Sequence, residues 1–388
     1  MFAAISQFTA LLQKLQTPSK NTTFSGFLIA TKVKQRHAIA THPDYLARLN
    51  STQTMYYSDY LQLNKILGAQ ELESDKANRH AHDEMLFIII HQSYELWFKQ
   101  IMFEVDSVHA IMSKPTINDN SPELMMVSRR MFRVVEIMRV LVHKVDILET
   151  MTPLDFLDFR DLLRPASGFQ SMQFKILEAK LGLKMEHRHG QQYYTSQLRP
   201  EDKAAIEKLS TEPTLLELLN NWLERMPFFE DAALWENGND KAFWQHYRET
   251  YGHSLGEGEK QNIDRFDELF MSSESKEGTL SDKARRAALF ILLYRDYPLL
   301  QNPYRIINLC LEVDELFATW RWRHMNMVHR MIGTRAGTGG STGKGYLREA
   351  ALKHYVFGEF AELNSFMIER RQLPVLAPEL EKVLSFQH

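Results

Sequence analysis

Hydrophobic positions recur with the 3.6-residue period of α-helices along most of the chain from about residue 54 onward. Alternating patterns typical of β-strands are scarce, and glycine and proline gather in a few places. We expect helices over residues 55–70, 82–112, 122–150, 283–294, 305–332 and 346–371. The first half of the helix over 82–112 is apolar on nearly every face, which predicts that it is buried all round. The pattern therefore predicts an all-α fold.

Two parts of the chain depart from this pattern. Residues 1–50 are polar, rich in threonine and serine, and carry a basic stretch around Lys32–Arg36. We interpret them as an N-terminal extension of unknown role. Residues 192–275 carry more charge and more turn signals, which predicts a small peripheral subdomain of short helices. Residues 51–388 are expected to form one all-helical domain that includes this subdomain.

The charge balance and the single cysteine exclude several classes of protein. The 46 basic residues nearly offset the 49 acidic ones, so the net charge of −3 favours neither a nucleic-acid partner nor an acidic membrane surface. No segment approaches the ~20 uninterrupted apolar residues of a membrane span. Cys310 is the only cysteine, which excludes an intrachain disulfide and favours a reducing, cytoplasmic location. Its apolar neighbours predict a buried thiol.

A histidine lies in the middle of the most apolar predicted helix. The segment reads HDEMLFIIIHQSYELWFKQ, and Phe87 precedes His91 by four residues, so the two side chains share a face. A buried imidazole needs a hydrogen-bond partner or a cavity. Two interpretations therefore stay open: a core histidine bonded to a neighbour, or a polar group in a pocket wall beside an aromatic plate.

A second histidine lies in ATWRWRHMNMVHRMIG, a predicted helix with two tryptophans and three arginines. Heme needs one strong nitrogen ligand, an apolar wall and cations for its propionates. His324, with Trp320 beside it and Arg321 and Arg323 flanking it, offers all three. An amphipathic helix with a solvated basic face is the alternative. His329 follows five residues later, about 140° round the helix, so the two histidines cannot bind one metal from the same face.

A third segment, MTPLDFLDFRDLLRPASGFQSMQF, places an aromatic residue four positions before an arginine. Phe156 and Arg160 therefore share a helical face. Guanidinium binds carboxylate in a bidentate manner, so this pair fits a ligand with an apolar body and a carboxylate. A surface arginine next to a core phenylalanine is the structural alternative.

The glycine-rich segment GTRAGTGGSTGKGYL resembles a phosphate-binding loop but fails its requirements. In GxxxxGK[ST] a glycine must precede Gly343 by five positions, and Thr338 stands there. Gly345 follows the lysine where serine or threonine is required. A nucleotide site is therefore not predicted. We expect instead a loop whose backbone N–H groups and hydroxyls close over a small ligand.

Together and in this order, these segments resemble the tryptophan 2,3-dioxygenase family. The resemblance runs from near Tyr56 to about residue 375 and is carried by YYSDYLQLNKILGAQ, HDEMLFIIIHQSYELWFKQ, FRDLLRPASGFQSMQF, WRWRHMNMVHRMIG and AGTGGSTGKGYL. It implies a heme b enzyme, active with ferrous iron, that assembles as a homotetramer, a dimer of dimers. It also implies that both atoms of O2 enter the indole C2–C3 bond of L-tryptophan to give N-formyl-L-kynurenine, the first step of the kynurenine pathway.

The resemblance further implies roles for single residues. His324 matches the proximal ligand of the heme iron, and His91 matches the distal histidine that hydrogen-bonds the indole N–H. Phe87 matches the residue that packs on the indole, and Arg160 the partner of the substrate carboxylate. Further expected pocket residues are Ile88, Ile89, Ile90, Phe156 and Thr338, Tyr57 and Tyr60 from a neighbouring subunit, and Ser167 and Trp320 beside the heme.

Two other functions remain compatible with this sequence. One is a related heme dioxygenase that acts on a substituted indole, since Arg160 and Thr338 select an amino acid but not its ring substituents. The other is a non-catalytic sensor of heme or tryptophan, which a turnover assay would distinguish.

Overall fold

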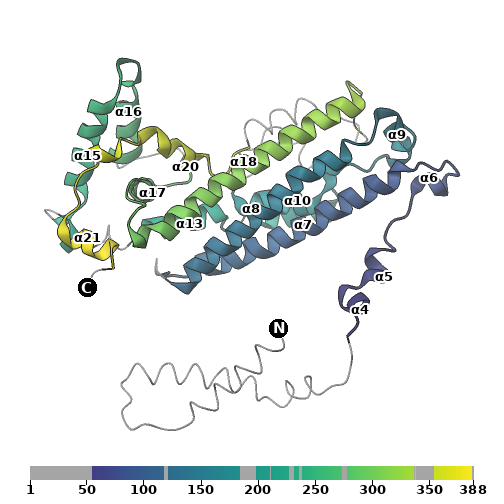
Figure 1. Cartoon of the computed structure of the whole chain (residues 1–388), viewed down its shortest axis with the longest axis horizontal. Helices are drawn as coiled ribbons and strands as arrows, with labels where there is room; N and C mark the ends of the chain where they lie inside the picture. The colour runs from purple at the N-terminus through teal and green to yellow at the C-terminus, as the bar shows by residue number, and fades with distance from the viewer. Residues whose placement is uncertain are drawn as a thin grey trace, which may run out of the picture. The chain divides into compact units, whose positions relative to one another are not determined.

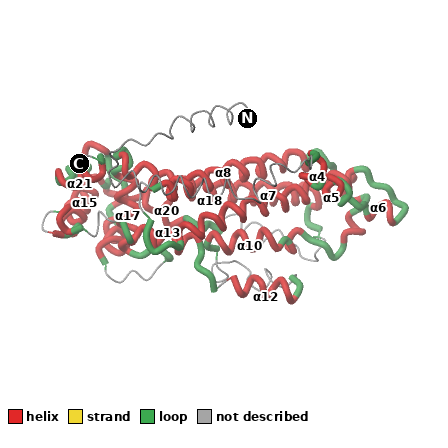
Figure 2. The backbone as a smooth tube through the Cα atoms, turned by 90° about the horizontal axis from the view of Figure 1, so that it is seen from below, coloured by secondary structure: helices red, strands yellow, loops and turns green. Residues whose placement is uncertain are grey.

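The computed structural model describes residues 55–117, 121–183, 198–209, 211–226, 231–235, 238–272, 278–335, 337 and 354–386. Every regular element in these ranges is helical, which confirms the predicted all-α fold (Figures 1 and 2). The chain divides into two compact units, residues 1–69 and 70–388. The N-terminal extension over 1–50 and Thr338 lie outside the described residues, and a separate subdomain over 192–275 stays a prediction.

Three long helices and one shorter helix form the main bundle of the second unit. Helix α8 (Pro122–Leu148) packs along both α7 (Asp83–Met112) and α18 (Pro298–Ile332), and α10 (Met172–Leu181) lies against α7 (Figure 1). Their shared core contains fully buried side chains such as Val105, Leu141 and Val313. Burial of such side chains stabilises each by roughly 1.5–3 kcal/mol, which holds the bundle together. No helix in the described ranges is long and apolar enough to cross a membrane.

Helix α18 is longer than predicted. It begins at Pro298, because proline at the first helical position loses no hydrogen bond there. Pro303 inside the helix removes one backbone hydrogen bond, while the neighbouring Leu300 and Ile306 are completely buried. Cys310 lies on the same helix and is buried and free, as its apolar neighbours predicted.

Shorter helices complete the two units. In the first unit the predicted helix over 55–70 is broken at Gln62, whose left-handed backbone (φ 52°) ends α4 before α5 begins.

The aromatic rings of Trp244, Tyr247 and Phe266 form a buried cluster at the α15 end of the second unit. The remaining elements are α4 Tyr57–Leu61, α5 Leu63–Ile66, α6 Glu73–Lys76, α9 Pro153–Leu157, η1 Arg160–Leu163, η2 Gly168–Gln170, α12 Pro200–Leu209, α13 Leu215–Glu224, η4 Ala232–Leu234, α15 Lys241–Ser254, η6 Glu257–Glu259, α16 Asn262–Phe266, η7 Asp267–Met271, α17 Asp282–Leu293, α20 Gly358–Glu362, η8 Leu363–Phe366, η9 Arg370–Gln372 and α21 Pro378–Leu384.

Two further predictions about the helices are wrong. The first half of α7 is not buried all round, since Ile89 and Leu96 are about half exposed. The helix predicted over 346–371 is replaced, in its described part, by the short elements α20, η8 and η9. Just before α20, the N–H groups of Val356 and Phe357 donate to the carboxylate of Asp314 on α18, at 3.0 and 2.6 Å.

Candidate active site

His91 on α7 adopts a defined tautomer. Its Nδ1 lies 2.7 Å from the carbonyl oxygen of Phe87, and because a carbonyl only accepts, Nδ1 carries the proton. Desolvation lowers the pKa of His91, so the imidazole is neutral at neutral pH. The side chain is nevertheless reached by solvent. Its Nε2 is therefore an acceptor for an N–H donor. The ring is bonded to a neighbour but is not a core histidine, since its side chain is exposed, and its place in a pocket wall stays a prediction.

An aromatic cluster adjoins His91. The ring centroid of Phe87 lies 4.1 Å from His91, 5.7 Å from Phe156 in a stacked arrangement, and 5.6 Å from Phe159. Phe159 is fully buried and meets Phe156 edge-on at 5.5 Å. Sequence reasoning missed Phe159, although it follows Phe156 by three residues and so shares its face. The cluster offers a flat apolar wall next to the polar imidazole.

The neighbouring isoleucines of α7 take different positions. Ile90 is buried in the core, Ile88 is half-buried and Ile89 is exposed. Adjacent helical residues point about 100° apart, so three consecutive side chains cannot share one face. The exposed Ile89 is therefore the one of the three most accessible to a ligand.

Arg160 is buried at the start of η1, directly after Phe159. Burial lowers the pKa of its guanidinium, and the charges of Arg164 and Arg335 lower it further, although the group stays protonated. Three arginines therefore contribute positive charge to one region. A carboxylate bound there would offset their repulsion.

The residues on either side of Arg160 are hydrogen-bonded by the exposed side chain of Arg79. The guanidinium of Arg79 binds the Asp161 carboxylate through two hydrogen bonds of 3.0 and 3.3 Å and donates to the carbonyl of Asp158 at 3.1 Å. The α6 segment before Arg79 is held in turn by buried Glu84, which accepts N–H groups at the start of α6. Arg79 thereby ties η1 to the segment that leads into α7.

His324 on α18 is half-buried and stacked on Trp320. The two rings are nearly parallel, with an interplanar angle of 7° and centroids 5.4 Å apart. Desolvation lowers the pKa of His324 to about 4. The imidazole is therefore neutral at neutral pH, with a lone pair available for a metal. The ring centroid of Tyr94, one turn beyond His91 on α7, lies 6.0 Å from that of Trp320, so the two histidine-bearing helices meet in this region.

The expectation that Arg321 and Arg323 supply cations for propionates is wrong. Arg321 is buried and donates to the Glu178 carboxylate and to the His354 carbonyl, both at 2.7 Å. Arg323 binds the carboxylates of Asp146 on α8 and of Glu149, which follows the last residue of that helix. Both guanidinium groups are already engaged by carboxylates of this chain.

The loop with Ser167 is connected to α7 by Glu95. Ser167 is half-buried, and its hydroxyl accepts the N–H of Phe169 at 3.4 Å. Shortly after it, Ser171 and Gln173 donate to the Glu95 carboxylate at 2.6 and 2.8 Å. Because Glu95 lies one turn beyond His91, this contact fixes the Ser167 loop relative to the helix that carries His91.

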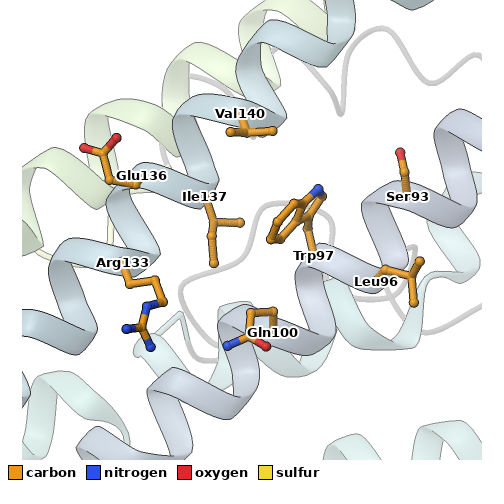
Figure 3. Close-up of a pocket in the computed structure, with 8 residues that line it drawn as sticks. All are labelled: Ser93, Leu96, Trp97, Gln100, Arg133, Glu136, Ile137 and Val140. Atoms are coloured by element: carbon orange, nitrogen blue, oxygen red, sulfur yellow. The ribbon is translucent and has the colours of Figure 1, made fainter. Parts of the chain in front are cut away.

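Tyr57 and Tyr60 are on α4 of the first unit, and their side chains are 75% and 71% exposed. A separate open pocket lies between α7 and α8, where Figure 3 shows Trp97 facing Ile137 and Val140. None of the predicted site residues lines it.

Similarity to known proteins extends over most of the chain. The family model described as tryptophan 2,3-dioxygenase matches residues 44–269 and 257–367. The chain belongs to the tryptophan 2,3-dioxygenase family. A tryptophan 2,3-dioxygenase of Bdellovibrio bacteriovorus is 42% identical over 363 residues, covering 86% of this chain and 99% of the relative. Tryptophan 2,3-dioxygenases of Alteromonas mediterranea (40%, 85% and 97% covered) and Aedes aegypti (39%, 87% and 91%) are also similar.

The match to the tryptophan 2,3-dioxygenase family includes both histidine-bearing helices. Residues 44–367 take in α7, η1 and α18, so the family assignment covers the whole arrangement described above. The family resemblance of the sequence is thereby confirmed.

Proposed function

We propose that this chain is a heme-dependent dioxygenase that inserts both atoms of O2 across the indole C2–C3 bond of L-tryptophan. The product is N-formyl-L-kynurenine, and the reaction is the first step of tryptophan catabolism by the kynurenine pathway. Family membership supports the reaction. The observation that carries the proposal is geometric. His91 adjoins an aromatic cluster that leads directly into buried Arg160. The helix of His91 meets the helix of His324 through the contact between Tyr94 and Trp320.

The residues around His324 fit heme b. A neutral imidazole is the form that coordinates iron, and a low pKa keeps His324 in that form. Trp320, stacked against it, provides an aromatic wall and restricts the rotation of the imidazole. Heme held by His324 would supply ferrous iron and the O2 chemistry. Ser167 is proposed to lie beside the same group.

The other side chains bind and orient the substrate. The cluster of Phe87, Phe156 and Phe159 packs on the indole, and Arg160 pairs with the carboxylate. His91 accepts the indole N–H at Nε2, because its Nδ1 proton is already donated to the Phe87 carbonyl. Indole N–H is a very weak acid, so His91 orients the ring rather than removing its proton.

We further propose that the active form is a homotetramer, a dimer of dimers. The exposure of Tyr57 and Tyr60 supports a role in which they enter the pocket of a neighbouring subunit. Thr338 is proposed to contact the amino-acid part of the substrate. A cytoplasmic location is supported by the single cysteine.

Turnover tests this function against its alternatives. Purified, heme-loaded, reduced protein mixed with L-tryptophan and O2 is expected to produce N-formyl-L-kynurenine, followed by its absorbance. A heme spectrum that responds to tryptophan without product formation would identify a sensor. Faster turnover of a ring-substituted tryptophan would identify a substituted indole as the substrate.

The change His91→Ala is expected to reduce kcat/KM for L-tryptophan by about 3- to 10-fold. This is the effect on the rate of losing one neutral hydrogen bond to the substrate. Steady-state kinetics on protein with matched heme content measures this effect. A loss of roughly 100-fold or more would contradict the orienting role, because general base catalysis contributes on that scale.

The acid limb of the pH profile is expected below the ordinary histidine range. Burial lowers the pKa of His91 from 6.5, so Nε2 keeps its lone pair as the pH falls through 6.5 and loses it only below the lowered value. The measurement is kcat/KM for L-tryptophan between about pH 5 and 8, the range in which histidine titrates. A half-maximal point at or above 6.5 that disappears in His91→Ala would contradict this assignment.

A further inference from the structure

The two arginines that flank His324 are held by different neighbouring helices. Arg321 donates through Nη2 to the Glu178 carboxylate of α10 at 2.7 Å and through Nη1 to the His354 carbonyl at 2.7 Å. The side chains of Arg321 and Glu178 are only 7% and 5% exposed. A buried ion pair of this kind tolerates little displacement, because moving one partner leaves the other charged and desolvated.

Arg323 connects α18 to α8 rather than to α10. Its Nη2 donates to the carboxylates of Asp146 and Glu149, the latter at 3.1 Å, and its Nη1 donates to the Val142 carbonyl at 3.2 Å. Asp146 and Val142 lie on α8, and Glu149 is the residue at its C-terminal end. Arg323 is about one quarter exposed, so this contact is less buried than the Arg321–Glu178 pair.

Helical geometry places His324 between these two contacts. At about 100° per residue, Arg321 points about 60° to one side of His324 and Arg323 about 100° to the other. The Arg321 contact therefore joins α18 to α10, and the Arg323 contacts join α18 to α8 and its C-terminal end. Because the two contacts lie on either side of His324 round the helix, together they oppose rotation of α18 in both directions.

We propose that the Arg321–Glu178 pair and the contacts of Arg323 with Asp146 and Glu149 are positioning devices for His324. They set the rotation of α18 and so the direction of the imidazole toward the cofactor. A rotation of about 20° would move the ring nitrogen by roughly 2 Å, and metal sites require placement within about 0.5 Å. The inference rests on the proposed role of His324 as heme ligand.

The test uses full-length heme-loaded protein and spectroscopy in addition to turnover. The double change Arg321→Met with Glu178→Met removes both buried charges while retaining their volume, a replacement that buried ion pairs often tolerate. Arg323→Met breaks the other contact at a partly exposed position. Arg330→Met, an exposed arginine on the same helix, is the matched control.

We expect transfer of heme to an apo-globin to be about 10-fold faster or more in both test variants, with electron paramagnetic resonance of the ferric heme split into several species. Arg330→Met should give the parent rate and a single species. Circular dichroism shows whether each variant is folded. If the double variant is unfolded, the heme-transfer rate and spectrum of Arg323→Met alone test the inference. Parent spectra and heme-transfer rates in the folded test variants would overturn the inference. Retention of the parent spectrum in His324→Ala would overturn the proposed function instead.

Discussion

The change His324→Ala is expected to remove nearly all bound heme and to reduce turnover by roughly 1,000-fold or more. Iron chemistry contributes several kcal/mol to such a reaction, and each 1.36 kcal/mol is tenfold in rate. The half-buried, neutral imidazole of His324, held in place by stacking on Trp320, is the donor on this face of α18. Heme content, measured from the Soret absorbance per protein, and turnover are both expected to fall.

His329 provides the matched control for this experiment. It is an exposed histidine on the same helix, about 140° away from His324. His329→Ala should keep the parent heme content and turnover. Full heme content and activity in His324→Ala would show that another group binds the iron.

The change Arg160→Ala is expected to lower kcat/KM for L-tryptophan by about 30-fold or more, mainly through a higher KM. Losing one partner of a buried, hydrogen-bonded charge pair costs about 2 kcal/mol or more. Arg160 is buried directly after Phe159 of the aromatic cluster, a position from which it can pair with the carboxylate of an indole amino acid. Arg160→Lys should recover only part of the loss, because an ammonium cannot make the bidentate contact.

Tryptamine, which lacks the carboxylate, distinguishes recognition from a general disturbance of the pocket. As a competitive inhibitor, tryptamine should have the same inhibition constant in the parent and in Arg160→Lys. An unchanged KM for L-tryptophan in Arg160→Ala would exclude this arginine as the carboxylate partner. Equal losses for tryptamine and L-tryptophan would indicate that the change has damaged the pocket as a whole.

Local features of this site could be predicted from the sequence. The contact between Phe87 and His91 follows from helical spacing alone, because residues four apart are neighbours on any α-helix. The stacking of Trp320 on His324 follows from the same spacing. Phe159 could have been found in this way, since it follows Phe156 by three residues.

Long-range partners could not be predicted in this way. Arg79 pairs with Asp161, 82 residues away, and Arg321 pairs with Glu178, 143 residues away. No local pattern indicates which of many carboxylates a given arginine meets, because the packing of the helices decides it. For this reason Arg321 and Arg323 suggested cofactor contacts from sequence, whereas the structure places them in contacts between helices.

The most direct test of the central claim is the fate of the two oxygen atoms. Reduced, heme-loaded protein turned over with L-tryptophan under 18O2 is expected to give N-formyl-L-kynurenine in which both inserted oxygens are labelled, as mass spectrometry would show. A parallel reaction in labelled water with ordinary O2 controls for exchange at the ketone. After this correction, a product with a single 18O atom, or no product at all, would contradict a dioxygenase.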